Sequence, residues 1–399
     1  MKGEFQNLPS GWKVMRLGDV AEKSILKNRN NLIKLVLSNS AIDGLVAQNE
    51  YFDKDIANKE NIQDYYIVDL GDFVYNPRIS QSAPTGPINR NMLSKGIVSP
   101  LYTVFTVQDE ILAKFLAYFF KTIVWQNQVK SVANYGARYD RINITDNAFF
   151  SLKILLPPLD EQKKIAEILS TWDEAINLTI NLIENKKQFK KALMQNLLTA
   201  KIRFPEFKDE WEETKLSEIF AEYTLLNTEN LRQYTIGKNG IKEINDNKYE
   251  INNHKVFVRN DFIVGIGIDE MNVNLNIEKG SCSPIYNVYS TNENFVNPNF
   301  IYFYIRKAIE RIKPFVTRKS TRREFEFNSS EFIKYKIKLP NLKEQQKIAE
   351  VLTACDDEIN LLNLKLENLK KQKQGLMQKL LSGNIRTKVK GGKNVKMDD

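Results

Sequence analysis

Two stretches of the chain repeat their apolar residues at alternating intervals of four and three positions. The series runs from Ile165 to Leu197 in the first stretch and from Ile348 to Leu380 in the second. A sustained heptad pattern of this kind predicts a long helix whose apolar seam pairs with another helix in a coiled coil. The residues expected to pair are Ile165, Leu169, Trp172, Ile176, Ile348, Leu352, Ile359, Leu362 and Leu366.

The two stretches are copies of one another. LPPLDEQKKIAEIL (156–169) recurs as LPNLKEQQKIAEVL (339–352), and the match extends over 48 residues at a constant offset of 183, with 25 identical positions. Each copy opens with proline and places a glutamate in its first turn, as is typical of helix starts. Because both seams share one register, we favour mutual pairing, which symmetry makes antiparallel. Packing of each helix on its own domain is the alternative.

Weaker similarities precede each copy, so the whole chain is predicted to be two half-molecules in tandem. GIVSPLYTVF (96–105), for example, resembles GSCSPIYNVY (280–289). The predicted fold class is α+β: two tandem mixed α/β domains separated by two long antiparallel coiled-coil helices, with pseudo-two-fold symmetry. Strand-like segments lie at 65–77 and 254–268, and helical segments at 113–129 and 295–313.

The repeat also predicts where the domains begin and end. The expected parts are a first globular domain at 1–155, a first helical region at 156–203, a second globular domain at 204–338, a second helical region at 339–383, and a basic tail at 384–399 that we expect to be disordered. Gly383 ends the second helix, and the tail is rich in Lys and Gly. Such a composition does not support a packed core.

Basic residues outnumber acidic ones, 58 against 49, which gives a formal net charge of +9. A basic excess suits a polyanionic partner such as nucleic acid, although a basic protein without such a partner is the alternative. NYGARYDRINIT (134–145) and TRKSTRREFEFNSS (317–330) occupy the same place in the two halves. Cations interleaved with Tyr, Asn, Ser and Thr contact phosphates and base edges. The candidate DNA-binding residues are Arg78, Arg138, Tyr139, Arg141, Arg318, Lys319, Arg322 and Arg323.

Catalytic and metal-binding sets are hard to find in this sequence. His254 is the only histidine, and the two cysteines are too few for a zinc site or a disulfide framework. No phosphate-binding loop of the G-x-x-x-x-G-K-[ST] type occurs. Asn297-Pro298-Asn299-Phe300 is close to the turn of amino-methyltransferases, but we interpret it as a helix-opening turn. We expect no catalytic residues, no metal, no membrane segment and a cytoplasmic protein.

The arrangement resembles the specificity (S) subunits of Type I restriction–modification systems, the HsdS family, over essentially the whole chain. GWKVMRLGDV (11–20) and EWEETKLSEI (210–219) are similar to the segments that open each target recognition domain of that family. LPPLDEQ and LPNLKEQ are similar to the starts of its two conserved helical regions. One departure is LLTAKIRF (197–204), which has a single Thr-Ala where the family often carries a short repeated tetrapeptide.

The resemblance implies a subunit that performs no chemistry itself. Each target recognition domain would read one half of a split, asymmetric site on double-stranded DNA, and the helices would set the spacing and dock two modification (methyltransferase) subunits. Two restriction subunits are optional further partners. S-adenosylmethionine, ATP and Mg²⁺ would bind those partners in DNA methylation and phage defence, and this chain would hold no cofactor. The alternatives are the specificity module of a related Type II methylase–nuclease and a coiled-coil scaffold without DNA binding.

Overall fold

The chain divides into two compact units, and each unit contains a part of both long helices. Unit 1 consists of Met1–Leu178 and Leu366–Asp399, and unit 2 of Thr179–Lys365. The computed structural model describes residues 8–51, 62–135, 140–229, 231–237, 240–244, 253–266, 271–318 and 326–388. The long helices α5 (Leu159–Leu197) and α9 (Leu342–Leu381) each contribute to both units.

Unit 1 is built on a four-stranded antiparallel sheet with the strand order β2-β9-β6-β7. Phe73 and Phe105, from its two central strands, stack on each other in the core. Phe120 packs edge-on against both rings and also contacts Trp125. Its elements are β1 (Lys13–Arg16), η1 (Leu17–Asp19), β2 (Glu22–Ser24), β3 (Leu37–Ser40), β4 (Gly44–Ala47), α1 (Gln48–Tyr51), η2 (Ile62–Asp64), β5 (Tyr66–Val68), β6 (Phe73–Tyr75), β7 (Ile88–Arg90), β8 (Gly96–Val98), β9 (Thr103–Thr106), α2 (Glu110–Phe119), α3 (Ile123–Val132), β10 (Asn134–Tyr135), β11 (Ile142–Asn143), α4 (Asp146–Phe150) and β12 (Lys153–Leu156).

The single helix predicted over 113–129 is wrong in one respect, because the structure has two helices there. Asp109 accepts hydrogen bonds from the N–H groups of Ile111 and Leu112 and so caps α2. Thr122 then adopts an extended conformation and caps α3 through the N–H of Trp125. An N-cap threonine starts a new helix because its hydroxyl satisfies a backbone donor that has no partner inside the helix.

Unit 2 repeats this topology although the two globular sequences have diverged. Its sheet β14-β21-β18-β19 has the same connectivity as β2-β9-β6-β7. Its elements are β13 (Glu212–Lys215), α6 (Leu216–Ile219), β14 (Phe220–Tyr223), β15 (Gln233–Gly237), β16 (Gly240–Glu243), β17 (Lys255–Phe257), β18 (Phe262–Ile266), β19 (Met271–Leu275), β20 (Gly280–Cys282), β21 (Asn287–Thr291), α7 (Pro298–Val316), β22 (Thr317–Arg318), β23 (Glu326–Phe327), α8 (Ser329–Lys334) and β24 (Lys336–Leu339).

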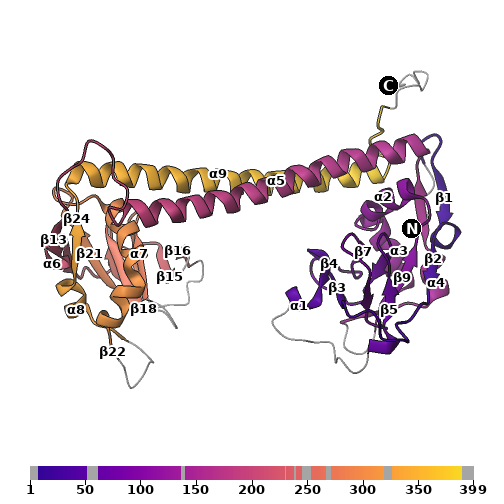
Figure 1. The fold of residues 1–399 in the computed structure, drawn as a ribbon, viewed down its shortest axis with the longest axis horizontal. Coiled ribbons are helices and arrows are strands. Elements are labelled where there is room, and N and C mark those ends of the chain that lie inside the picture. Colours follow the sequence, from indigo (N-terminus) through magenta and orange to yellow (C-terminus); the bar gives the residue numbers. More distant parts are fainter. Residues whose placement is uncertain are drawn as a thin grey trace. The chain divides into compact units, whose positions relative to one another are not determined.

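The helix expected over 295–313 is present as α7, which packs on the sheet of unit 2 (Figure 1). Asn297 caps it by accepting a hydrogen bond from the N–H of Phe300, and Pro298 stands in its first turn. The Asn-Pro-Asn-Phe segment is therefore a helix-opening turn, as the sequence predicts. Proline suits this position because it has no N–H to leave unpaired.

In each unit, segments of α5 and α9 lie antiparallel to one another (Figure 1). Ile165 and Leu169 belong to the core of unit 1, which also contains Leu380 and Leu381 from the end of α9. The equivalent core of unit 2 joins Ile348, Leu352 and Ala349 with Leu197 and Leu198 from the end of α5. The helix starts therefore pack both on the other copy's helix end and on their own globular part, so the two alternatives drawn from the sequence occur together there.

Farther from the helix starts the seam is less deeply buried. Ile359 is buried, whereas Trp172, Ile176, Leu362 and Leu366 are half-buried. Residues 389–399, most of the tail predicted to be disordered, lie outside the described residues.

Candidate nucleic-acid interface and helix clamps

The two basic stretches fall at the same topological position in the two units. In unit 1, strands β10 and β11 pair between α3 and α4; in unit 2, strands β22 and β23 pair between α7 and α8. In each unit the paired strands therefore connect one helix (α3 or α7) to the short helix that precedes the next strand (α4 or α8). This equivalence was expected from the sequence order alone, and it places both basic segments on comparable scaffolds.

Five of the eight candidate DNA-binding residues belong to parts of the two basic stretches that the structure does not describe. Arg138, Tyr139, Lys319, Arg322 and Arg323 lie outside the described residues. The backbone of Arg318 belongs to β22 and pairs with Glu326.

Arg78 and Arg141, 63 positions apart in the sequence, are brought together in unit 1. They form an antiparallel β-bridge, in which the N–H of Ile79 donates to the carbonyl of Asp140 at 3.0 Å and the N–H of Ile142 donates to the carbonyl of Pro77 at 3.0 Å. Both arginines line a cavity of about 460 Å³ that also includes Tyr102. Burial raises the pKa of the Tyr102 hydroxyl, and the charges of Arg78 and Arg141 oppose that rise.

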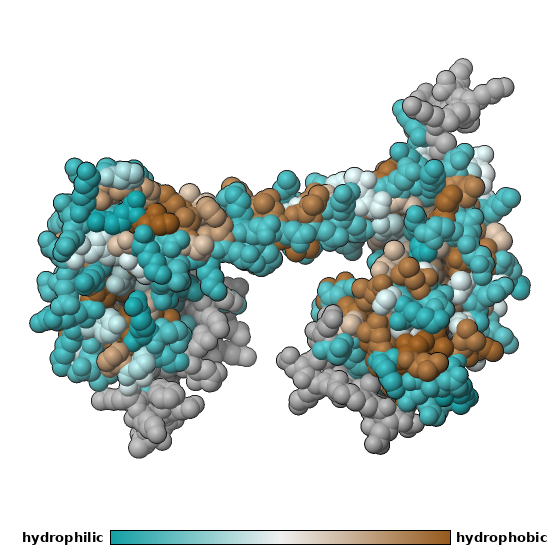
Figure 2. Space-filling view, viewed as in Figure 1, coloured by the Kyte–Doolittle hydropathy of each residue, from teal (hydrophilic) through white to brown (hydrophobic). Residues whose placement is uncertain are grey.

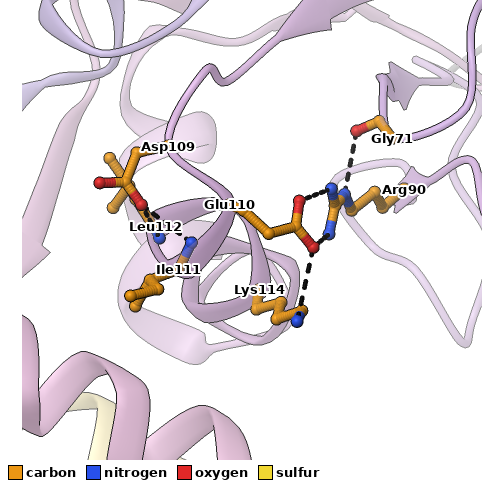
Figure 3. Close-up of polar contacts among 7 residues, drawn as sticks. All are labelled: Gly71, Arg90, Asp109, Glu110, Ile111, Leu112 and Lys114. Atoms are coloured by element: carbon orange, nitrogen blue, oxygen red, sulfur yellow. Dashed lines mark hydrogen bonds and ion pairs between the residues drawn. The ribbon is translucent and has the colours of Figure 1, made fainter.

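A third arginine of unit 1, Arg90, has a structural role that sequence reasoning missed. Its guanidinium donates to both carboxylate oxygens of Glu110, at the start of α2, and its Nε donates to the carbonyl of Gly71 at 3.0 Å (Figure 3). Hydrogen bonding to Arg90 lowers the pKa of Glu110. Arg90 therefore fixes the turn before β6 to the first turn of α2.

The repeated Glu-Gln pair at the helix starts holds the two copies together. In unit 1, Arg386 donates from Nε to Glu161 at 2.8 Å and from Nη2 at 2.9 Å; we call this pair clamp 1. In unit 2, Arg203 donates to Glu344 at 2.9 and 2.7 Å; we call this pair clamp 2. Both glutamates are almost fully buried, at 2% and 0% exposure. Each clamp joins the start of one copy's helix to the residues that follow the other copy's helix.

The glutamine of each pair fixes the backbone that enters the helix. Gln162 donates from Nε2 to the carbonyl of Pro157 at 2.8 Å, and Gln345 donates to the carbonyl of Pro340 at 2.9 Å. These carbonyls lie just beyond the last paired residues of their strands, and a buried backbone carbonyl needs a hydrogen-bond partner.

A second pair of contacts repeats in both units about three helical turns farther along. Lys373 pairs with Asp173 in unit 1 (rung 1), and Lys190 pairs with Asp356 in unit 2 (rung 2). Each lysine also lies over an aromatic ring, 5.3 Å from the centroid of Tyr118 or 4.9 Å from that of Phe303. Burial raises the pKa of Tyr118, and its hydrogen bond to Asp173 adds to the rise.

These clamps and rungs were missed at the level of sequence, although a signal was present. Glu161, Asp173, Lys190 and Arg203 all have identical counterparts 183 positions later. In an antiparallel helix pair, the residue numbers of two contacting residues add up to nearly the same value at every contact. Glu161 with Arg386 and Glu344 with Arg203 both satisfy that condition. Lys190 and Lys373 fall at positions of the four-three series, and apolar periodicity names no partner for a lysine there.

No catalytic constellation stands out in the part of the chain that is described. His254 is buried, and burial lowers its pKa. Cys282 and Cys355 are free thiols. Among the residues with described positions, no three of His, Cys, Asp and Glu gather closely enough to hold a metal ion. None of the described helices has the length and apolar content needed to cross a bilayer.

Two units of one topology, each with a basic hairpin and with equivalent contacts between its segments of α5 and α9, define the class of DNA-recognition subunits with two tandem recognition domains. A model of the family described as the Type I restriction modification DNA specificity domain matches the chain twice, at residues 9–186 and 208–371. The chain belongs to this family. It is a non-catalytic specificity subunit of a Type I restriction–modification system, with two DNA-recognition domains in tandem.

Two curated specificity subunits are similar to this chain, one of them over nearly its whole length. A protein of Methanocaldococcus jannaschii named for the MjaX type I restriction enzyme specificity subunit is 26% identical over 429 residues, which cover 97% of this chain and 97% of that protein. The MjaVIII specificity subunit of the same organism is 25% identical and covers 62% of this chain and 65% of its own length.

Two solved structures share the fold. The crystal structure of the HsdS subunit from Thermoanaerobacter tengcongensis matches with a TM-score of 0.50 and 17% identity, covering 96% of this chain and 100% of that one. The S subunit from M. genitalium matches with a TM-score of 0.56 and 16% identity, covering 94% of this chain and 97% of that one.

Proposed function

We propose that this chain reads a bipartite, asymmetric site on double-stranded DNA, one half with each unit. The target recognition domains would be residues 1–155 and 204–338, and the helical regions 156–203 and 339–383 would separate them. The observation that carries this proposal is the basic hairpin found between the same two helices in both units. A scaffold that binds only proteins would not need a basic segment on each of two diverged domains.

The DNA contacts we propose come from the hairpins and from the Arg78–Arg141 bridge. The bridge supports this assignment because it joins two cations at a cavity. The proposed contact residues are Arg78, Arg138, Tyr139, Arg141, Arg318, Lys319, Arg322 and Arg323.

The proposed protein partners are two modification subunits docked on the helices, with restriction subunits as further partners in the complete assembly. Figure 2 shows apolar residues among the polar ones on the surface of the helix pair. Leu178 is 62% exposed and its counterpart Leu361 is 67% exposed. An exposed leucine retained in both copies suits a partner that binds twice, because water gives it no stabilising contact.

The chemistry in this proposal takes place on the partners. S-adenosylmethionine would bind the modification subunits, and ATP and Mg²⁺ the restriction assembly, all in the cytoplasm where cellular DNA is available. This chain would then supply only sequence recognition and spacing.

The test is selection of bound duplexes from a random library by the full chain assembled with its modification subunits. We expect two fixed half-sites separated by an unread gap. Alanine at 318, 319, 322 and 323 together should weaken selection of one half-site, with a lower salt dependence of binding. No selection by the wild-type assembly, or DNA methylation by the isolated chain, contradicts the proposal.

A further inference from the structure

The cavity beside the Arg78–Arg141 bridge contains the clearest group of available cations among the described residues of unit 1. We call Arg78, Arg141, Tyr102 and Asn76 the basic recess; all four line the cavity of about 460 Å³. No hydrogen bond or ion pair is recorded for the Arg78 guanidinium within the described part of the chain. Among the described residues, the ion-pair partner of the Arg141 side chain is the carboxylate of Asp140, at 3.8 Å from its Nε. Arg90, in contrast, is fully engaged by Glu110 and Gly71 (Figure 3).

The hydrogen bonds that Asn76 makes inside the recess leave the hydroxyl hydrogen of Tyr102 free to donate to a ligand. Asn76 accepts the N–H of Arg78 at 3.0 Å, and its Nδ2 donates to the carbonyl of Asn39 at 3.2 Å and to the Tyr102 hydroxyl at 3.3 Å. Because the Tyr102 oxygen accepts from Asn76, its own hydrogen is available for donation. A ligand would therefore meet two guanidinium groups and one hydroxyl donor.

The shape of the recess separates two kinds of DNA contact. Base edges lie at the floor of a major groove about 8.5 Å deep, so a base reader has to project from the protein surface. Phosphates stand out along the ridges of the duplex, so a concave site can receive them. Bases also present both donors and acceptors, whereas a phosphodiester presents only acceptors.

We propose that the basic recess holds one backbone phosphate of the bound DNA, with Arg78 and Arg141 as shared anchors and not as base readers. The proposal rests on the proposed function, since it assigns a role within the same DNA complex. It predicts that the recess contributes affinity equally to every sequence and leaves the choice of half-site to other residues.

The first test compares Arg78→Ala/Arg141→Ala with wild type in the full assembly with modification subunits. The double variant should bind about tenfold more weakly to the selected site and to unrelated duplex alike. The slope of log affinity against log salt should fall by about 0.9, the value for one lost phosphate. Arg78→Lys/Arg141→Lys should retain that slope, and Arg16→Ala, an exposed arginine on β1, serves as the matched control.

The second test replaces single phosphates of the selected duplex by neutral methylphosphonates. Wild type should show one position where neutralisation weakens binding about as much as the double variant does, and the double variant should show no further loss there. A changed half-site sequence would identify the arginines as readers, and a slope change near 1.8 would give each arginine its own phosphate; either result overturns the proposal. If wild type selects no site at all, the proposed function fails instead.

Discussion

At the scale of single residues, the two clamps are equivalent in position but differ in the donors that reach the glutamate. Glu161 accepts the indole N–H of Trp12 at 3.1 Å and the backbone N–H of Thr387 at 3.4 Å in addition to Arg386. Glu344 has Arg203 as its side-chain donor. Trp211 is the counterpart of Trp12 in the second half, and its indole nitrogen is buried without a hydrogen-bond partner among the described residues. Clamp 2 thus depends more heavily on its arginine than clamp 1 does.

This difference predicts an order of destabilisation. Arg203→Ala should lower the free energy of unfolding by about 3–5 kcal/mol, because it leaves a buried carboxylate without a counter-ion. Glu344→Ala should cost less, about 1.5–3 kcal/mol, since the partly exposed Arg203 then regains water. Arg386→Ala should also cost less than Arg203→Ala, because Trp12 still donates to Glu161. Urea unfolding of the three variants measures this order, and equal losses for the two arginines would contradict it.

A pH effect is expected at Arg90 and Glu110. Because the hydrogen bond lowers the pKa of Glu110 below its ordinary 4.5, the folded state is stabilised above that value. The stabilisation is lost as pH falls through the folded-state pKa. The pair is largely exposed on the glutamate side, so the effect should be about 1 kcal/mol or less.

Thermal unfolding between pH 6 and pH 3 measures this contribution. Arg90→Ala should remove most of the pH dependence that Glu110→Gln removes, because the ion pair of Glu110 with Lys114 remains. The double variant should remove no more than Glu110→Gln alone. An unchanged pH dependence in both single variants would show that the pair does not contribute.

At the scale of elements, the helices combine apolar helix starts with polar rungs. Apolar periodicity predicted the helices and their pairing because burial of an apolar stripe follows directly from 3.6 residues per turn. Periodicity carries no information on which lysine meets which aspartate, since that depends on the direction and stagger of the partner helix. The rungs supply this specificity: Asp173 meets Lys373, and Asp356 meets Lys190, only in the antiparallel arrangement.

Reversing one rung should therefore test the pairing. Asp173→Lys should destabilise unit 1 through repulsion with Lys373, and Asp173→Lys/Lys373→Asp should recover most of the loss. We expect a coupling energy of about 1 kcal/mol that declines with added salt, since Asp173 is partly exposed. The equivalent exchange at Asp356 and Lys190 is the matched control. Absence of recovery in both units would exclude a role of the rungs in setting the stagger.

At the scale of the whole molecule, the sequence predicts the tandem organisation, but it does not predict which chain segments make up each compact unit. The 183-residue repeat predicted two half-molecules, and two recognition domains are present. Each long helix is divided between the two units because its end packs into a core formed by distant residues. Leu380 and Leu381 of α9, for example, belong to the core of unit 1. Likewise, the meeting of Arg78 and Arg141 depends on one β-bridge between distant segments, which composition and periodicity do not encode.

A matched deletion tests whether the helices act as a spacer. Removing 180–186 together with 363–369 deletes seven residues from each helix between the rungs, so both clamps and both rungs keep their stagger. Each helix shortens by about 10.5 Å, which equals about three base pairs. Library selection should return unchanged half-sites with a shorter gap, or weaker binding where DNA twist misplaces one half. Altered half-site sequences with a constant gap would mean that the helices themselves read DNA.

The membership of Leu380 and Leu381 in the core of unit 1 also sets the order in which the protein can mature during synthesis. Ile165 and Leu169 leave the ribosome early, but their α9 partners follow about 200 residues after the first part of unit 1 ends at Leu178. At about 5–20 residues per second, the N-terminal domain waits roughly 10–40 seconds with an apolar face uncovered. A chain cut short before residue 376 therefore presents chaperones and proteases with an incomplete first domain as well as a shortened second helix.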